Sequence, residues 1–310
     1  MKKISLIPAV AALATVGAYA ESPTVYGKVN VALQNADEAD SSKLELVSNA
    51  SRLGVKGKLD IEDTGLKGIY QIEFEVAADD GTAGKDGNTI TQRNTFVGLQ
   101  GGFGTAKAGI FDTPLKVAQK KVDLFNDLEG DIKHIITVND NRPDNIVQYS
   151  TPKFADVVSL NGAVIASEDE DVDNGFSGSI TADMDFGLYL AAAYDTGVES
   201  EEADVARLVA QYKVAGFQFG VLYETMEEGD ADSVDGYVLS AQYAPNKWAF
   251  KVQAGNSDIK EEDGQTYSLG VDYKFNKKFK TFVYYTDNQY VDGAADVESS
   301  YLGLGTELKF

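Results

Sequence analysis

Residues 267–310 read YSLGVDYKFNKKFKTFVYYTDNQYVDGAADVESSYLGLGTELKF, and their pattern decides the fold. Apolar and polar residues alternate along 267–275 and along 301–310, which is the period of a β-strand with two different faces. A short connection at 275–278 follows the first of these strands, whereas a long acidic connection at 286–299 precedes the last one. Short turns at one end of the strands and long loops at the other end are typical of a transmembrane β-barrel.

The same alternation occurs throughout the chain from Thr24 onward. Short connections lie at 63–65, 101–104, 152–156, 183–187, 214–216, 244–247 and 275–278. Long and mostly acidic connections lie near 35–50, 79–90, 112–143, 167–175, 195–204, 226–235, 256–265 and 286–299. The two kinds alternate strictly, so these seven short and eight long connections join sixteen strands. We therefore predict an all-β fold, a sixteen-stranded antiparallel transmembrane β-barrel with short periplasmic turns and long extracellular loops.

The two faces of the strands predict which side meets lipid. The polar face is rich in Lys, Arg, Glu, Asp and Gln, and a barrel of sixteen strands has a lumen wide enough for water. We therefore expect the polar face inside and the apolar face against lipid. Aromatic residues near the short-turn ends suit an interfacial girdle; they are Tyr212, Phe217, Tyr243, Trp248, Tyr273, Phe275 and Phe310. A secreted β-sandwich is the alternative, but it leaves the strict alternation of connections unexplained.

The first twenty residues predict a cleaved Sec-type signal peptide. Lys2 and Lys3 precede an apolar stretch, and Ala18-Tyr19-Ala20 fits the small-x-small cleavage pattern. We expect residues 1–20 to be removed and residues 21–310 to form a single barrel domain.

The composition excludes most enzyme classes. The 310 residues carry a formal net charge of −22, which repels phosphates and disfavours binding of nucleic acid. Cysteine is absent from the sequence and His134 is the single histidine, which excludes thiolate catalysis, Cys-ligated metals and sites with two imidazoles. We therefore expect no enzymatic activity, no cofactor and no metal site.

Acidic runs such as Glu168-Asp169-Glu170-Asp171 mark several of the long connections. One interpretation is an electronegative vestibule that attracts cations, or divalent ions that bridge the loops to lipopolysaccharide. The other interpretation is a solvated surface of mutually repelling charges. The acidic balance of the whole chain predicts a mild preference for cations.

Several short patterns follow one another in order along the chain after residue 20. They are Val25-Tyr26-Gly27-Lys28, Ser51-Arg52-Leu53-Gly54-Val55-Lys56-Gly57, Gln92-Arg93-Asn94-Thr95-Phe96-Val97-Gly98-Leu99, Phe111-Asp112-Thr113-Pro114, Val122-Asp123-Leu124-Phe125, Arg142 with Asn145-Ile146-Val147-Gln148-Tyr149, and Gly303 to Phe310. In this order the sequence resembles the Gram-negative general diffusion porins, the trimeric outer-membrane porins of proteobacteria. The resemblance implies a homotrimer in the outer membrane, in contact with lipid, lipopolysaccharide and the assembly machinery. It also implies a water-filled channel for passive diffusion of ions and small hydrophilic solutes.

The resemblance further implies where the channel is narrowest. The third long connection, about 112–143, is expected to fold into the barrel as a constriction loop. The resemblance places a basic wall opposite this loop, formed by Lys28, Arg52, Arg93 and Arg142. We expect four carboxylates of the loop to face that wall, those of Asp123, Asp127, Glu129 and Asp131. The terminal Phe310 is implied as the signal for the assembly machinery.

Two other functions remain open for such a barrel. A substrate-specific channel, for example for sugars or dicarboxylates, is the alternative within transport. A non-conducting adhesin or structural barrel is the alternative from another class. Conduction in a bilayer separates the second alternative from a diffusion channel.

Overall fold

A computed structural model describes residues 22–38, 41–81, 88–138, 142–293 and 295–310. The predicted signal peptide, residues 1–20, lies outside the described residues. Within the described ranges, no helix combines the length and the apolar character needed to cross a membrane.

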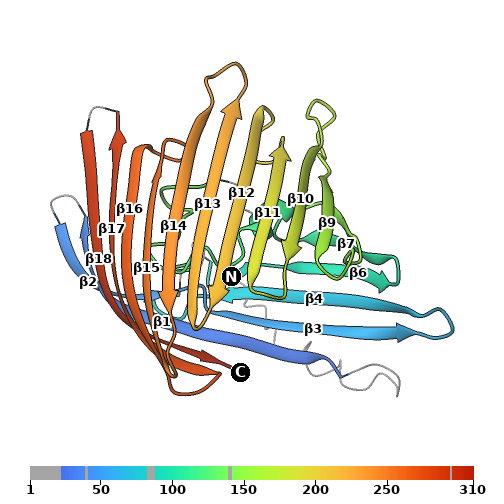
Figure 1. The fold of residues 1–310 in the computed structure, drawn as a ribbon, viewed down its shortest axis with the longest axis horizontal. Helices are drawn as coiled ribbons and strands as arrows, with labels where there is room; N and C mark the ends of the chain where they lie inside the picture. Colours follow the sequence, from blue (N-terminus) through green and yellow to red (C-terminus); the bar gives the residue numbers. More distant parts are fainter. Residues whose placement is uncertain (1–21, 39–40, 82–87, 139–141, 294) are drawn as a thin grey trace, which may run out of the picture.

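The described residues form one closed antiparallel sheet of eighteen strand segments (Figure 1). The segments are β1 (Thr24–Glu38), β2 (Ser41–Ser48), β3 (Arg52–Ile61), β4 (Leu66–Val76), β5 (Ile90–Gln92), β6 (Thr95–Gly101), β7 (Gly104–Ile110), β8 (Ile146–Ser150), β9 (Val158–Ile165), β10 (Gly175–Asp183), β11 (Leu188–Thr196), β12 (Ala203–Val214), β13 (Phe217–Glu228), β14 (Val234–Tyr243), β15 (Trp248–Ser257), β16 (Glu262–Lys274), β17 (Phe279–Asp292) and β18 (Ala295–Lys309). Pairing of β1 with β18 closes the ring. Because β2 and β3 both pair with β1, and β5 and β6 both pair with β4, each couple is one interrupted barrel strand. The barrel therefore has sixteen strands, as the connections predict.

Both interruptions lie next to arginines of the predicted basic wall. Between β2 and β3, Ala50 adopts a left-handed conformation with φ of 48°, and Ser51 Oγ accepts a hydrogen bond from the Asn30 N–H at 2.9 Å. Between β5 and β6, the Arg93 N–H donates to the Glu73 carbonyl at 2.9 Å. An interrupted ladder bends the strand locally and changes the direction of the neighbouring side chains.

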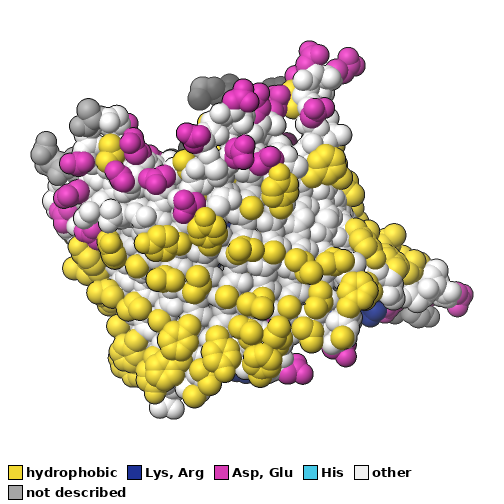
Figure 2. All heavy atoms as spheres, turned by 45° about the horizontal axis from the view of Figure 1, so that its top comes forward, with side chains coloured by type: hydrophobic (Ala, Val, Ile, Leu, Met, Phe, Trp, Pro, Cys, Tyr) yellow, Lys and Arg dark blue, Asp and Glu magenta, His cyan; other side chains and the backbone are white. Residues whose placement is uncertain are grey.

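The apolar face of the strands points away from the lumen. Val25 and Leu304 are 57% and 61% exposed, whereas Lys251 and Gln253 on the inner face are 7% and 3% exposed. Figure 2 shows a band of hydrophobic side chains across the barrel, with acidic side chains gathered above it. The predicted orientation, polar inside and apolar outside, is confirmed.

Aromatic side chains form a belt at the short-turn ends of the strands. Phe217 stacks on Tyr243 with ring centres 4.3 Å apart, and Trp248 contacts Tyr273 edge-on at 4.7 Å. The contacts continue from Tyr273 to Phe275 at 4.9 Å. The predicted girdle therefore has the continuity expected where a barrel crosses a membrane interface.

The connections at the opposite end are shorter than several of the predicted loop ranges. β17 and β18 pair as far as Asp292 and Ala295, and β1 and β2 pair as far as Glu38 and Ser41. The ranges 35–50 and 286–299 are therefore mainly strand. Polar hairpins continue the backbone ladder beyond the apolar band, where no run of apolar residues marks them in the sequence.

The connection between β7 and β8 folds into the barrel, and Figure 1 shows it in green inside the ring of strands. We call its residues 111–138 the pore loop. It begins with one helical turn, α1 (Pro114–Ala118), in which Thr113 Oγ1 accepts a hydrogen bond from the Lys116 N–H at 3.2 Å. Most of its apolar side chains pack on the inner wall of β11–β14 in one buried cluster, whereas Phe125 and Leu128 pack in a second cluster with Phe282 and Tyr284 of β17. The first cluster contains Leu115, Ala118, Val122, Ile132, Ile135, Ile136 and Val138 of the loop with Tyr189, Ala191, Ala193, Val205, Val209, Leu222 and Val238 of the wall.

Candidate channel constriction

Two cavities in the lumen lie on either side of the tip of the pore loop. The cavity toward the short turns has a volume of about 620 Å³ and reaches Phe310. The cavity toward the opposite end has a volume of about 820 Å³ and reaches Glu199. Arg52, Asn126 and Asp127 line both of them. The boundary between the cavities is therefore the contact of the loop tip with the wall at Arg52.

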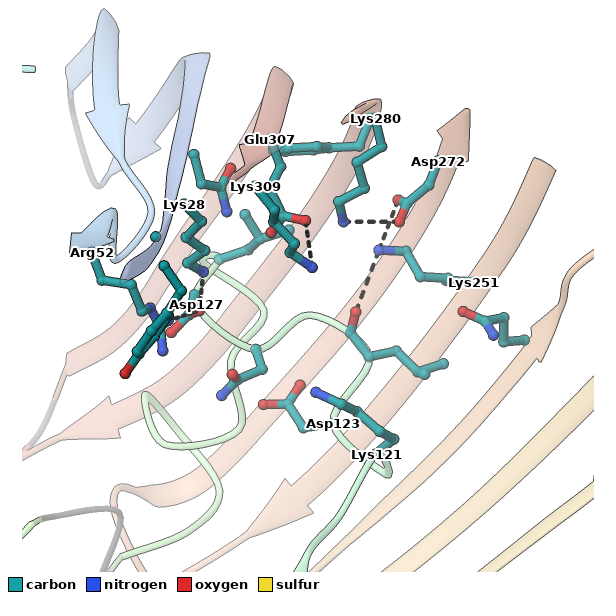
Figure 3. A pocket seen from close by; sticks show the side chains of 18 of the residues that line it. Lys28, Arg52, Lys121, Asp123, Asp127, Lys251, Asp272, Lys280, Glu307 and Lys309 are labelled. Atoms are coloured by element: carbon teal, nitrogen blue, oxygen red, sulfur yellow. Dashed lines mark hydrogen bonds and ion pairs between the residues drawn. The ribbon is translucent and has the colours of Figure 1, made fainter. Parts of the chain in front are cut away.

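The loop carboxylate Asp127 touches the predicted basic wall directly (Figure 3). Its Oδ2 lies 2.6 Å from Lys28 Nζ and 2.7 Å from Arg52 Nη2. Asp127 has φ of 69°, and its N–H donates to Asp131 Oδ2 at 2.9 Å, which stabilises this left-handed turn. Burial alone would raise the pKa of Asp127, but the cations of Lys28 and Arg52 lower it to about 2. Asp127 is therefore ionised at neutral pH.

Arg93 pairs with carboxylates of the wall itself. Its Nε lies 3.0 Å from Glu73 Oε1, and its Nη1 lies 2.5 Å from Glu75 Oε2. Glu73 also accepts a hydrogen bond from the Tyr26 hydroxyl at 2.8 Å and lies 3.8 Å from Arg52 Nη1. The wall opposite the loop is thus mixed in charge, and its two glutamates offset the repulsion between its arginines.

Arg142 lies where the chain returns from the pore loop. Its Nε lies 2.9 Å from Asp112 Oδ1, which Lys116 Nζ also approaches at 3.6 Å. Burial acts to raise the pKa of Asp112, but Arg142 and Lys116 lower it below its ordinary value. Arg142 lines the same cavity as Arg52 and Arg93, so the structure brings the three predicted arginines together around one cavity.

The other three predicted carboxylates make different contacts. Glu129 Oε1 accepts a hydrogen bond from Gln34 Nε2 on β1 at 2.9 Å. Asp131 is 2% exposed and is directed back into the loop, where Asn126 Nδ2 donates to it at 3.2 Å. Asp123 is 3% exposed and lines the cavity toward the short turns. Asp127 is therefore the carboxylate that bridges the lumen to the predicted cations.

A second charged row lies on the inner wall of β15–β18 (Figure 3), and the sequence did not reveal it as a site. Asp272 Oδ1 lies 2.9 Å from Lys251 Nζ, and Asp272 Oδ2 lies 3.1 Å from Lys280 Nζ. Lys309 Nζ lies 3.0 Å from Glu307 Oε1. The alternation of the strands predicts that these side chains point into the lumen, but it does not predict which of them form ion pairs.

The acidic excess of the chain is not found in the two cavities. Six basic and five acidic side chains line the cavity toward the short turns. Seven basic and six acidic side chains line the cavity toward the opposite end. The lumen around the loop tip is therefore close to neutral, although the whole chain carries −22. Acidic side chains gather instead at the loop end of the barrel in Figure 2. The acidic excess of the chain therefore lies at the mouth and not at the loop tip.

A family model described as Gram-negative porin matches residues 8–293. The chain belongs to the Gram-negative porin family. This porin is similar to outer membrane protein U of Vibrio parahaemolyticus, with 25% identity over 278 residues that cover 84% of this chain and 79% of the relative. It is also similar to a monosaccharide porin of Halomonas sp, with 27% identity over 283 residues, 78% of this chain and 76% of the relative.

Solved porin structures share the barrel. An anion-selective porin from Comamonas acidovorans superposes with a TM-score of 0.73 at 20% identity, over 93% of this chain and 99% of that chain. Salmonella typhi OmpF in complex with daunomycin gives 0.74 at 16% identity, over 93% and 97%. Membership of the family places this porin in the outer membrane as a channel protein and not an enzyme, as the sequence predicts.

Proposed function

We propose that this porin forms a water-filled channel for passive diffusion of ions and small hydrophilic solutes, with a charged constriction at the tip of the pore loop. The observation that carries the proposal is the contact of Asp127 with Lys28 and Arg52 at the boundary between two cavities. A hydrophilic solute finds polar partners on both sides of this boundary. An apolar solute displaces oriented water there without replacing its hydrogen bonds, and is slowed.

The residues of the constriction have different tasks in this proposal. The basic side consists of Lys28, Arg52, Arg93 and Arg142. On the acidic side, Asp127 and Glu129 reach the opposite wall through Lys28, Arg52 and Gln34. Asp131 stabilises the turn that presents Asp127, and Asp123 contributes charge to the cavity toward the short turns.

The proposed ion preference is mildly cationic. The acidic side chains at the mouth support it, and the nearly balanced lining of the two cavities explains why it is mild. Exposed charges act over a Debye length of about 10 Å at 0.1 M salt, so the mouth concentrates cations without determining the field at the loop tip. The barrel fold does not set the sign of selectivity, since one structural neighbour is an anion-selective porin.

The proposal includes a homotrimer. The aromatic belt covers the ends of β12–β17, but the outward positions nearest the short turns on β1, β3 and β4 are aliphatic: Val25, Leu59, Ile61 and Leu66. Aromatic side chains suit a membrane–water interface, whereas an aliphatic stretch suits burial against a second copy. Vibrio cholerae OmpT, described in a trimer form, superposes with a TM-score of 0.66 at 17% identity, over 93% of this chain and 99% of that chain.

Both ends of the chain have proposed roles in export and assembly. Residues 1–20 act as the cleaved signal peptide, and residues 21–310 form the barrel that contacts lipid and lipopolysaccharide. Phe310 is 50% exposed and accessible to the assembly machinery. Its N–H donates to the Gly27 carbonyl at 3.1 Å, so it also completes the closure of the ring.

The test is conduction by the refolded chain. Residues 21–310 are refolded in detergent and added to a planar bilayer under a salt gradient. Stepwise conductance supports the channel, steps in groups of three support the trimer, and the reversal potential gives the ion preference. A barrel that folds and inserts but stays silent overturns the proposal. Conduction that is selectively blocked by one sugar or dicarboxylate favours a substrate-specific channel.

A further inference from the structure

An arginine–glutamate pair is completely buried at the neck of the pore loop. Here the segment that leaves β7 and the segment that returns toward β8, the two limbs of the loop, both meet the barrel wall. Arg207 of β12 and Glu224 of β13 are directly opposed in strand register, and both side chains are 0% exposed. Arg207 Nε lies 2.5 Å from Glu224 Oε2. Burial of two charges is costly unless their other hydrogen-bonding groups also have partners. Those partners therefore indicate what the pair does.

Further hydrogen bonds of the pair reach both limbs of the pore loop. On the limb that leaves β7, Arg207 Nη1 donates to Gln119 Oε1 at 3.2 Å and to the Leu115 carbonyl at 3.4 Å. On the returning limb, Arg207 Nη2 donates to the Val138 carbonyl at 3.2 Å. Glu224 Oε1 accepts a hydrogen bond from the Val138 N–H at 3.1 Å. One pair on the wall thus joins the two limbs at the neck of the loop.

Other side chains of the wall hold the loop away from its neck. Gln253 binds both the Leu124 N–H and the Gly130 carbonyl at 2.8 Å, and Lys251 Nζ donates to the Leu124 carbonyl at 3.3 Å. Gln218 Nε2 donates to the Lys121 carbonyl at 2.8 Å, and Ser257 Oγ donates to the Ile136 carbonyl at 2.7 Å. The pairing of β12 with β13 does not depend on the charged pair, because the two strands share twelve register pairs. The charged pair therefore contributes to the loop more than to the strands.

We propose that Arg207 and Glu224 are positioning residues, a clamp at the neck of the pore loop that fixes the loop tip and so holds the channel in one open state. The inference rests on the proposed channel function. The loop crosses the lumen between the clamp at its neck and the ion pairs of Asp127 at its tip. The ion pair at the tip is partly exposed to water, with Asp127 14% and Lys28 11% exposed, so we expect it to restrain the loop less than the completely buried ion pair of the clamp.

A neighbouring carboxylate makes the two halves of the clamp unequal. Asp195 of β11 is 0% exposed and lies within the electrostatic reach of both Arg207 and Glu224. Removal of Arg207 leaves two buried carboxylates without their shared cation. Removal of the charge of Glu224 leaves Arg207 beside Asp195. We therefore expect Arg207→Met to release the loop more than Glu224→Gln does.

The experiment compares single-channel records of the wild type, Arg207→Met, Arg207→Lys and Glu224→Gln. Lysine keeps the charge of Arg207 but lacks the planar guanidinium that reaches four acceptors at once. Thr266→Val is the matched control, because Thr266 is buried on the inner wall and donates at 2.7 Å to the directly opposed Asn288, which binds the loop at the Glu129 carbonyl and not at its neck. Folding of every variant is checked by circular dichroism and by gel mobility without heating.

The expected result is a wild type and a Thr266→Val channel with one main conductance level. In Arg207→Met the time spent in other levels rises by at least about tenfold, as loss of a restraint on a two-state element predicts. Arg207→Lys and Glu224→Gln give smaller increases. If Arg207→Met does not fold, Arg207→Lys decides the question.

A folded Arg207→Lys or Arg207→Met channel with the single level of the wild type overturns the clamp. An equal increase in Thr266→Val overturns it too, because any buried polar change would then have the same effect. A silent wild type overturns the channel function instead, so the two failures are distinguishable.

Discussion

Lys28 and Asp127 are 99 positions apart in the sequence, yet Lys28 Nζ lies 2.6 Å from Asp127 Oδ2. The contact joins the first barrel strand to the tip of the pore loop. The same carboxylate oxygen lies 2.7 Å from Arg52 Nη2 on β3. The loop tip therefore reaches the opposite wall, and the channel must pass beside this three-residue contact.

Asp127→Asn is expected to shift the ion preference toward anions. The amide keeps the size of the side chain but leaves Lys28 and Arg52 without their negative partner. A unit charge about 4 Å away changes the energy of an ion by roughly 1 kcal/mol in water, which corresponds to about a fivefold change in local concentration. The reversal potential under a salt gradient measures this shift.

The matched control for this prediction is Asp169→Asn. It removes the same charge from an exposed position in a long connection, away from both cavities. We expect it to change the reversal potential much less than Asp127→Asn. Equal shifts in the two variants would show that total charge, and not the contact at the loop tip, sets the preference.

The contact at the loop tip is expected to survive mild acid. The pKa of Asp127 is lowered from 3.8 to about 2, so its stabilising contribution is complete above the unfolded pKa and is lost as pH falls through 2. At 1.36 kcal/mol for each unit, the contribution is about 2 kcal/mol. Conductance and noise should therefore be constant from pH 8 to about pH 4 and change only in stronger acid. If Asp127→Asn shows the same acid transition as the wild type, another carboxylate is responsible.

Strand number could be predicted from the sequence because its signals are local. The alternation within 267–275 depends on neighbouring residues alone, and the length of a connection such as 275–278 can be read directly. The strand ends at the long connections could not be predicted as well from the sequence. Polar hairpins such as the one that pairs Asp292 with Ala295 have no apolar face to mark them.

The partners inside the lumen could be predicted only in part. The resemblance placed Arg52 on the basic wall, and Asp127 was one of four carboxylates expected to face it. Which charges meet depends on strand register and on the path of the pore loop, neither of which is a local property. Arg93 therefore pairs with Glu73 and Glu75, and the side chain of Asp131 turns back into its own loop.

Arg93→Ser is expected to raise conductance and strengthen the preference for cations. Serine removes bulk from the cavity and leaves Glu73 and Glu75 without the cation that they share. Arg93 is 7% exposed, and breaking a buried ion pair by removing one partner costs about 3–5 kcal/mol, so the thermal midpoint of the barrel should fall as well. An unchanged conductance and reversal potential in a folded variant would remove Arg93 from the constriction.

The preference for cations is expected to weaken with salt. If it arises from acidic side chains at the mouth, screening reduces it, because the Debye length falls from about 30 Å at 0.01 M to about 3 Å at 1 M. Reversal potentials at a constant concentration ratio but increasing mean concentration measure the effect. A preference that does not change over this range would locate its origin at the loop tip, where the ion pairs are partly buried.

Phe310→Ala is expected to lower assembly in cells more than it lowers stability in detergent. The variant keeps the backbone hydrogen bonds to Gly27 that close the barrel. It loses an aromatic side chain that is already 50% exposed. The cost to the folded barrel should therefore be no more than about 1–2 kcal/mol, a fraction of the value for a buried aromatic.

The amount of heat-modifiable barrel in outer-membrane fractions, compared with the refolding yield of the purified chain, separates the two effects. Phe310→Tyr, which keeps the aromatic ring, serves as the control. Equal losses in the membrane and in detergent would show that Phe310 acts in ring closure and not as a signal to the assembly machinery.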